Sequence, residues 1–183
     1  MLPLAERLRP KTLNEYIGQK HLVGEGAILR QMIENNSLSS FILWGPPGVG
    51  KTTLARIIAH QLERPFYTLS AVTSGVKEVR EVIDKAKRYA VMNSGLFGDG
   101  QLATGDRRAI LFIDEIHRFS KSQQDSLLGA VEDGTITLIG ATTENPSFEV
   151  ITPLLSRCEV SVREPLEEAD LRALLHQARD EDD

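Results

Sequence analysis

The sequence feature that most constrains the fold is the run FILWGPPGVGKTT over residues 41–53. Its first four residues are apolar, as in a short buried parallel strand, and apolar side chains recur with helical spacing over residues 54–62. Between these segments, the spacing of a phosphate-binding loop is filled by Gly45, Gly50, Lys51 and Thr52. The order of strand, glycine-rich loop and helix predicts an α/β fold with a phosphate site.

The residue types in this loop indicate how a nucleotide would bind. Backbone N–H groups of such a loop surround phosphate oxygens, and the N-terminus of the following helix directs its dipole toward them. Lys51 is expected to reach the β- and γ-phosphates, and the Thr52 hydroxyl to bind Mg²⁺. A glycine turn that binds nothing is the alternative, and the flanking strand and helix argue against it. Nucleotide contacts are therefore predicted at Gly45, Pro46, Pro47, Gly48, Val49, Gly50, Lys51, Thr52 and Thr53.

A second apolar run, AILFI over residues 109–113, ends in two carboxylates, Asp114 and Glu115. In a parallel α/β sheet, ligands bind at the carboxyl ends of the strands. Asp114 is therefore predicted to hold Mg²⁺ together with Thr52, and Glu115 to orient the attacking water of a hydrolysis. The two strands are expected to be neighbours in the sheet. Two acids that merely end a strand are the alternative.

Further elements follow from the spacing of apolar and capping residues. Strands are predicted over 66–70 and 135–140 and in the segment that ends at residue 162, and helices over 27–35 and 76–90. Ser120 and Gln123 have capping-box spacing, which predicts that a helix starts there and ends near Gly134. Strand 135–140 leads to Thr142 and Thr143, whose hydroxyls could sense the γ-phosphate or position water. His117 is expected to make a structural hydrogen bond, and a proton shuttle is the alternative.

Composition and charge exclude several classes of protein. The chain has 183 residues and a net charge of −5, with 41% hydrophobic and 26% charged residues, which is typical of a globular protein. No apolar run approaches the roughly 20 residues that span a bilayer, and the first residues lack a signal-peptide core. A cytoplasmic location is expected. The single cysteine, Cys158, is predicted to be a buried structural thiol in a reducing compartment.

Three features leave two interpretations open. The irregular residues 1–25 are predicted to form an ordered arm, either as a wall on the adenine side of a nucleotide or as plain packing. Arg157 is either a helix-end cap or surface charge, or a guanidinium that stabilises transition-state charge on a neighbouring subunit's phosphate. The polar face of helix 76–90 either contacts nucleic acid or is solvated through i,i+4 ion pairs, which join Glu81 to Lys85 and Asp84 to Arg88. Its charged residues include Lys77, Arg80, Glu81, Asp84, Lys85, Lys87 and Arg88.

Taken together, these motifs resemble those of the AAA+ ATPases of the clamp-loader-like branch. LRPKTLNEYIGQ, GPPGVGKTT, ILFIDEIHRF and LLSRC resemble its adenine-side arm, Walker A, Walker B and arginine-finger motifs. More narrowly, LSAVTSGVKEVR, DEIHRFSKSQQDSLL and DGTITLIGATTENPSFE are similar to the replication-associated recombination protein A family. The resemblance covers about residues 4–175. The glycine-rich residues 93–108 depart from it, because that segment is longer than expected for the family.

The resemblance implies a P-loop NTPase of the AAA+ type, with a five-stranded parallel sheet flanked by helices and only the start of a helical lid. It implies an N-terminal arm over 1–25, an ATPase core over 26–164 and a first lid helix over 165–183. It also implies an activity, which is Mg²⁺-dependent ATP hydrolysis stimulated by DNA at forks and single-strand/double-strand junctions.

The resemblance further assigns roles residue by residue. Thr143 corresponds to the sensor that hydrogen-bonds near the γ-phosphate, and Arg157 to a finger that acts in trans. Ser70 corresponds to the residue that holds the catalytic glutamate inactive. The expected catalytic residues are thus Glu115, Lys51, Thr143 and Arg157, and the expected adenine-side contacts are Arg9, Pro10, Tyr16 and Ile17.

For the full-length protein, the resemblance implies a nucleoid-associated homo-oligomer that works with replication or recombination proteins. Family members continue into a complete lid and an oligomerisation region, so this chain is expected to be an amino-terminal piece, monomeric and with weak ATPase activity. Three alternatives remain: a clamp-loader subunit, a Holliday-junction branch-migration motor, and a nucleotide-binding scaffold that does not hydrolyse.

Overall fold

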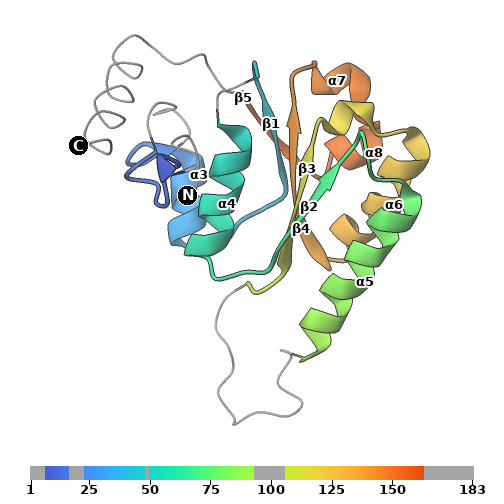
Figure 1. Ribbon diagram of the computed structural model, residues 1–183, viewed down its shortest axis with the longest axis horizontal. Helices are drawn as coiled ribbons and strands as arrows, with labels where there is room; N and C mark the ends of the chain where they lie inside the picture. Colours follow the sequence, from blue (N-terminus) through green and yellow to red (C-terminus); the bar gives the residue numbers. More distant parts are fainter. Residues whose placement is uncertain (1–6, 17–22, 48–49, 93–105, 163–183) are drawn as a thin grey trace.

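Five parallel strands form the centre of the molecule, as shown by a computed structural model that describes residues 7–16, 23–47, 50–92 and 106–162 (Figure 1). The order across the sheet is β2-β3-β4-β1-β5, and every neighbouring pair is parallel. The strands are β1 (Phe41–Trp44), β2 (Phe66–Ser70), β3 (Ala109–Asp114), β4 (Ile136–Thr142) and β5 (Glu159–Val162). The predicted α/β class with a parallel sheet is confirmed.

The strand order corrects one prediction. β1 and β3 were expected to be neighbours, but β4 pairs with both of them and lies between them. In register, Trp44 of β1 is opposite Thr142 of β4, and Ile113 of β3 is opposite Gly140. The apolar character of a run predicts that a strand is buried, whereas its neighbours are set by how the connecting helices cross the sheet. The end of β4 is therefore central to the carboxyl edge of the sheet.

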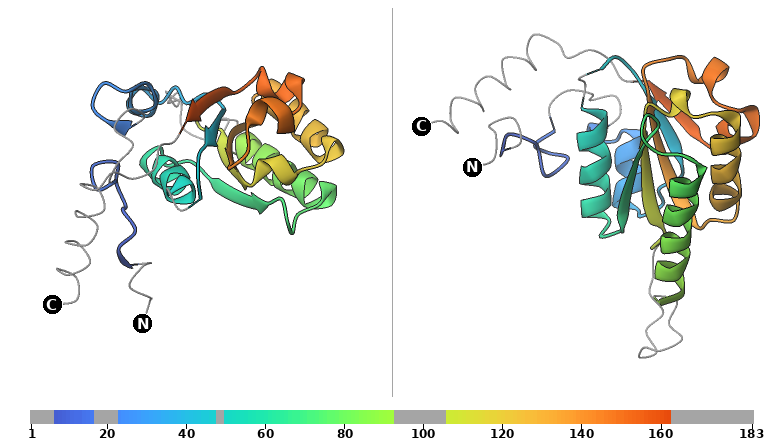
Figure 2. Two further views of the ribbon diagram at one scale, coloured as in Figure 1. Left: turned by 90° about the horizontal axis from the view of Figure 1, so that it is seen from above. Right: turned by 45° about the vertical axis from the view of Figure 1, so that its right-hand side comes forward.

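Helices cover both faces of the sheet, giving three layers (Figures 1 and 2). On one face lie α3 (Ile28–Glu34) and α4 (Lys51–Gln61). On the other lie α5 (Val76–Met92) and α6 (Lys121–Glu132), with the short α7 (Pro146–Glu149) and α8 (Thr152–Leu155). The 3₁₀ turn η1 (Ile116–Arg118) follows β3. Among the described helices, none is both long and apolar enough to cross a membrane.

Alternating strand residues supply two separate apolar cores, because successive side chains of a strand point to opposite faces. Ile42 packs into the cluster under α5 and α6, while Phe41 and Leu43 pack into the cluster under α3 and α4. β3 follows the same pattern, with Leu111 in the first cluster and Phe112 in the second. Both faces of the sheet are thus buried, which explains why these strands read as continuous apolar runs.

Two predictions about helices can be compared with the structure. The capping box of α6 is confirmed, since the Ser120 hydroxyl accepts from the Gln123 amide and the Gln123 side chain accepts from the Ser120 amide at 2.7 Å. On α5, the predicted i,i+4 pairs join Glu81 to Lys85 and Asp84 to Arg88. Among the described residues, the ion pair of this face instead joins Lys77 to Glu81 at 3.9 Å. The basic side chains of α5 remain on an exposed surface.

Cys158 lies just before β5 and is half-buried rather than fully buried. Burial raises the pKa of its thiol to about 12. A thiol with so high a pKa stays protonated at neutral pH and is a poor nucleophile. This agrees with a structural role.

A cluster of charged and polar side chains around the buried Arg64 lies at the amino ends of the strands. Arg64 is only 5% exposed, and its guanidinium donates to the Arg108 carbonyl oxygen and to the Thr137 hydroxyl. Its third nitrogen lies 3.5 Å from an Asp106 carboxylate oxygen. Asp106 also pairs with Arg108 at 2.6 Å. We call these residues the Arg64 cluster: Arg64, Asp106, Arg108 and Thr137.

Candidate functional site

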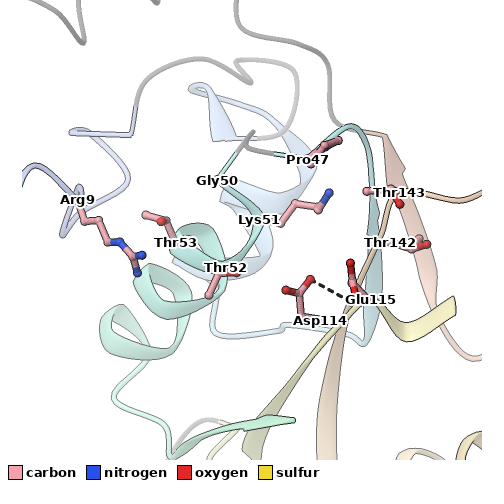
Figure 3. Close-up of a pocket in the computed structure, with 10 residues that line it drawn as sticks. All are labelled: Arg9, Pro47, Gly50, Lys51, Thr52, Thr53, Asp114, Glu115, Thr142 and Thr143. Atoms are coloured by element: carbon pink, nitrogen blue, oxygen red, sulfur yellow. Dashed lines mark hydrogen bonds between the residues drawn. The ribbon is translucent and has the colours of Figure 1, made fainter. Parts of the chain in front are cut away.

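A cavity of about 340 Å³ lies at the carboxyl edge of the sheet (Figure 3). Its lining comes from the N-terminal arm, the phosphate loop, the first turn of α4 and the ends of β3 and β4. The lining residues are Arg9, Pro47, Gly50, Lys51, Thr52, Thr53, Asp114, Glu115, Thr142 and Thr143. The two predicted acids therefore share one cavity with five of the predicted loop residues: Pro47, Gly50, Lys51, Thr52 and Thr53.

Gly50 determines where α4 begins and how closely the arm approaches. Its φ of 79° lies in the left-handed region, and a Cβ there would come within 2.9 Å of the Tyr16 hydroxyl. Only glycine adopts this conformation without strain and leaves that space. Tyr16 in turn donates a hydrogen bond to the Gly50 carbonyl at 3.2 Å. The N-terminal arm is thus fastened to the phosphate loop.

Lys51, the first residue of α4, extends into the cavity from a mostly buried position, with 9% of its surface exposed (Figure 3). Its ammonium donates to the carbonyl oxygens of Gly45 at 2.8 Å and Pro46 at 3.1 Å. Burial lowers the pKa of Lys51, while the negative charges of Asp114 and Glu115 raise it. The cavity therefore combines a cation with two nearby carboxylates.

The two carboxylates enter the cavity because the chain turns sharply where β3 ends. Glu115 has φ 51° and ψ 46°, a left-handed conformation that is uncommon for a residue other than glycine. Its amide donates to Asp114 at 2.9 Å, the bond drawn in Figure 3. Its own carboxylate lies 3.3 Å from the Arg118 guanidinium. The turn lets two consecutive residues line the same cavity.

Thr52 and Asp114 are suitable ligands for Mg²⁺. A hydroxyl and a carboxylate are the hard oxygen donors that Mg²⁺ prefers, and this ion commonly takes only one or two protein ligands beside phosphate oxygens and waters. Both residues line the cavity. Among the described residues, no group of three or more His, Cys, Asp or Glu side chains could hold a metal by itself. The donor set fits an ion that binds together with a nucleotide.

Two threonines at the end of β4 have different surroundings. Thr143 is exposed and lines the cavity. Thr142 is 1% exposed, and its hydroxyl oxygen lies 2.9 Å from His117 Nδ1 and 3.0 Å from the Glu144 amide nitrogen. The structural hydrogen bond expected of His117 is thus present. Its partner was not predictable, because Thr142 and His117 lie on different elements.

Not all of the remaining predicted residues line the cavity. Among the adenine-side residues, Arg9 lines it, whereas Pro10 and Tyr16 are described and do not. Ile17, Gly48 and Val49 lie outside the described residues. The adenine-side contacts therefore stay a prediction.

Arg157 does not line the cavity. It follows α8 and pairs with Glu132 of α6 at 3.2 Å, on the surface. Ser70, at the end of β2, is opposite Asp114 in register, and its hydroxyl accepts from the Val72 amide at 3.3 Å. The roles predicted for Arg157 and Ser70 stay predictions.

Comparison with known proteins decides the family. Residues 41–166 match the family described as "ATPase family associated with various cellular activities (AAA)". The chain belongs to this family. The match covers the sheet from β1 to β5 and all the carboxyl-edge residues of the phosphate loop, β3 and β4.

Within the AAA ATPases, similar curated proteins bear out the narrower resemblance. Replication-associated recombination protein A of Haemophilus influenzae is 51% identical over 96% of this chain and 36% of its own length. The Escherichia coli K12 protein of the same name is 51% identical over 98% of this chain and 37% of its own length. ATPase WRNIP1 of Dictyostelium discoideum is 50% identical over 94% of this chain and 18% of its own length. The chain thus spans little more than a third of the bacterial relatives.

Solved structures show the same architecture. A RuvB Holliday junction branch migration motor of Thermotoga maritima is 31% identical, with a TM-score of 0.72 over 94% of this chain and 54% of that one. A K64R mutant of the same protein has a TM-score of 0.75 at 29% identity, and the match covers 95% of this chain and 55% of that one. These structures and the family match confirm the predicted AAA P-loop NTPase fold.

Proposed function

We propose that this chain is the ATP-hydrolysing module of a replication-associated recombination factor. One observation carries the proposal: Lys51 of the phosphate loop and the Asp114 and Glu115 carboxylates line one cavity although they come from different strands and helices. A phosphate-binding cation beside a pair of acids is the arrangement that P-loop NTPases use for hydrolysis. The family and the named relatives support the same activity.

The chain's own groups divide the work of binding and hydrolysis. The Gly50 amide and the Lys51 ammonium bind and orient the β- and γ-phosphates, and Lys51 leaves the loop carbonyls when phosphate is present. Glu115 orients the attacking water and draws its proton, while Arg118 restrains the Glu115 carboxylate at 3.3 Å. Thr143 donates a hydrogen bond to the γ-phosphate or to that water. Such preorganised groups act on charge as it develops in the transition state.

Mg²⁺ is proposed to be held by Thr52 and Asp114. When bound, it neutralises phosphate charge and so favours attack by water. The adenine side of the nucleotide is proposed to lie against Arg9, Pro10, Tyr16 and Ile17. The fastening of Tyr16 to Gly50 supports this, because it keeps the arm beside the phosphate loop.

Arg157 is proposed to act on the phosphate of a neighbouring copy of the chain. Within its own subunit it lies outside the cavity, in a surface pair with Glu132. The full-length protein would then work as a homo-oligomer. This chain alone would be monomeric with slow turnover, since no neighbour supplies the guanidinium. Light scattering that finds a stable oligomer with fast turnover would contradict this part.

DNA is the proposed stimulator, at forks and single-strand/double-strand junctions in the cytoplasmic nucleoid, together with replication or recombination proteins. The names of the relatives carry this proposal, and the exposed basic side chains of α5 offer a surface for the phosphate backbone. A branch-migration motor is the second candidate, supported by the similarity to RuvB. The higher identity to replication-associated recombination protein A favours the first.

One experiment tests the activity and separates these candidates. The ATP hydrolysis rate is measured for the longest natural chain that carries this sequence, with no DNA, single strands, forks and four-way junctions, over a salt series. Stimulation by forks supports the leading proposal, and stimulation confined to four-way junctions supports the motor. Equal rates with every DNA would refute the DNA role.

The Glu115→Gln variant tests the site within the same experiment. It should still bind ATP but lose turnover, because glutamine cannot accept the proton of the attacking water. Unchanged turnover would remove Glu115 from its role. A wild-type protein that binds ATP but does not turn it over would identify a nucleotide-binding scaffold.

A further inference from the structure

The turn that follows β3 is tightly packed against the end of β4. Ile116 of η1 is fully buried, and a Cβ on Gly140 of β4 would lie 3.2 Å from its Cδ1 atom. The absence of a side chain at Gly140 therefore admits Ile116. The next residue, His117, places Nδ1 2.9 Å from the Thr142 hydroxyl oxygen. Two consecutive residues of the turn thus contact the strand that lies between β1 and β3.

The hydrogen-bond capacity of Thr142 decides which group donates. A hydroxyl has one hydrogen and two acceptor lone pairs. The Thr142 oxygen has three partners: the Glu144 amide at 3.0 Å, the Glu144 carbonyl at 3.2 Å and His117 Nδ1. The amide can only donate and the carbonyl can only accept. All three contacts are satisfied together when His117 donates from Nδ1.

The buried Thr142 hydroxyl would have hydrogen-bond partners even without His117. The Glu144 amide and carbonyl already give the Thr142 hydroxyl one donor and one acceptor. His117 adds a further constraint, and it does so between two elements that are far apart in the sequence. The elements it joins each carry a cavity residue: Glu115 lies two positions before His117, and Thr143 directly follows Thr142.

We propose that His117 is a positioning residue that fixes the Glu115 carboxylate relative to the Thr143 hydroxyl by tying η1 to the end of β4. The inference rests on the proposed ATPase function and deepens it. Glu115 and Thr143 are the groups that would face the attacking water and the γ-phosphate. Small displacements between such groups slow a reaction with little effect on ground-state binding. His117 itself is not among the residues that line the cavity.

The test compares two amide variants in the longest natural chain that carries this sequence. In His117→Asn the amide nitrogen is bonded to Cγ, as Nδ1 is in histidine, so the N–H donor keeps its position. In His117→Gln the amide nitrogen is one carbon further from the backbone. Losing a single hydrogen bond of this kind is expected to lower kcat about three- to tenfold. His117→Gln should show this fall, and His117→Asn should stay within about twofold of wild type. KM and the affinity for a non-hydrolysable ATP analogue, measured by calorimetry, should change in neither.

A double-mutant cycle identifies the partner. Thr142→Val removes the hydroxyl and keeps the side-chain shape, so it should also slow turnover. If His117 acts through Thr142, the double variant His117→Gln with Thr142→Val should be no slower than Thr142→Val alone. Additive losses would overturn the proposal, as would equal kcat values for His117→Asn and His117→Gln.

A matched control separates positioning from general damage. Thr137→Val removes a buried hydroxyl bond at the opposite end of the same strand, where the partner is Arg64. It should lower the thermal midpoint without a selective fall in kcat. Failure of this inference is distinguishable from failure of the proposed function. In the first case wild type hydrolyses ATP in a Glu115-dependent way and the His117 variants match it; in the second, wild type shows no such hydrolysis.

Discussion

The two edges of the sheet hold their polar groups in opposite ways. At the carboxyl edge, Lys51, Asp114 and Glu115 face a cavity, and Asp114 is exposed to solvent. At the amino edge, Arg64 is 5% exposed and is surrounded by Asp106, Thr137 and the Arg108 carbonyl. One set of charges is left open to a ligand, and the other is neutralised within the protein.

The difference teaches which charges serve stability and which serve function. A buried charge is tolerated when its partners are close, so removing one partner leaves the other buried and unpaired. In the Arg64 cluster, removing Arg64 takes away the buried partner of Asp106, which then keeps only its more exposed pair with Arg108. Lys51, Asp114 and Glu115 at the carboxyl edge line a cavity instead. A phosphate and a metal ion bound in this cavity would pair with these charges and stabilise them. Variants at the two edges should therefore affect different measurements.

The largest effect is expected from Lys51→Ala at the carboxyl edge. Removing the phosphate-binding cation should lower the ATP hydrolysis rate about a thousandfold, since electrostatic contacts to a transition state carry this order of effect. The thermal midpoint should fall little, because burying an ammonium opposes folding. Arg56→Ala, an exposed cation on the same helix, is the control. Comparable losses in both variants would refute a specific role for Lys51.

Arg64→Leu should have the largest effect on stability. It leaves the Asp106 carboxylate without its deeply buried partner, which typically costs about 3 kcal/mol in the free energy of unfolding. Urea denaturation followed by circular dichroism measures this loss. The exposed neighbour Arg107 provides the control, and Arg107→Leu should be near neutral. Below the unfolding transition, Arg64→Leu should hydrolyse ATP normally; a selective fall in kcat would break the division between the two edges.

Stability at acid pH should depend on Asp106. Burial raises the pKa of this carboxyl, but the hydrogen bonds from Arg108 and the charge of Arg64 outweigh burial, and the net pKa is lowered from 3.8. The unfolded chain therefore takes up this proton first as pH falls. The contribution of Asp106 is complete above about pH 4 and is lost as pH falls through the folded pKa.

The Asp106→Asn variant isolates this contribution. It should be about 1.5 kcal/mol less stable than wild type at pH 6, which is the order expected for hydrogen bonds to a charged group. The two proteins should converge as pH falls through the lowered pKa of the wild-type Asp106 carboxyl, where it becomes protonated. Urea denaturation at several pH values gives the comparison. A difference that stays constant over this range would assign the effect to packing.

The smallest effect is expected from Tyr16→Phe, which tests how firmly the arm is held to the carboxyl edge. The variant loses the hydroxyl bond to the Gly50 carbonyl, worth about 1 kcal/mol in a half-buried position. Limited proteolysis should cut the arm somewhat faster, and ATP analogue affinity should fall by no more than about fivefold. Phe66→Leu is the control, since it changes an aromatic side chain that packs against the same apolar cluster as Tyr16 but lies at the amino end of β2 and does not line the cavity. A loss of affinity larger than tenfold would mean that the Tyr16 hydroxyl contacts the nucleotide.

Local features of the fold were predictable because they depend on residues close together in the chain. The bounds of β1 and β2 agree with the predicted strands, and the capping box at Ser120 starts α6 as expected. The phosphate loop and the acids after β3 were found for the same reason, since each motif lies within a short run. β4 was predicted to end at Gly140 and extends to Thr142, because pairing with β1 continues past the apolar residues.

What the sequence by itself determined was the identity of the groups at the carboxyl edge and the elements that carry them. Tertiary structure alone decided that β4 lies between β1 and β3, that His117 meets Thr142, and that Arg64 is neutralised by Asp106 and Thr137. The physical reason is the range of the interactions. Periodicity and capping report on hydrogen bonds and burial within one element, whereas strand order and buried polar partners depend on contacts between segments 25 or more residues apart.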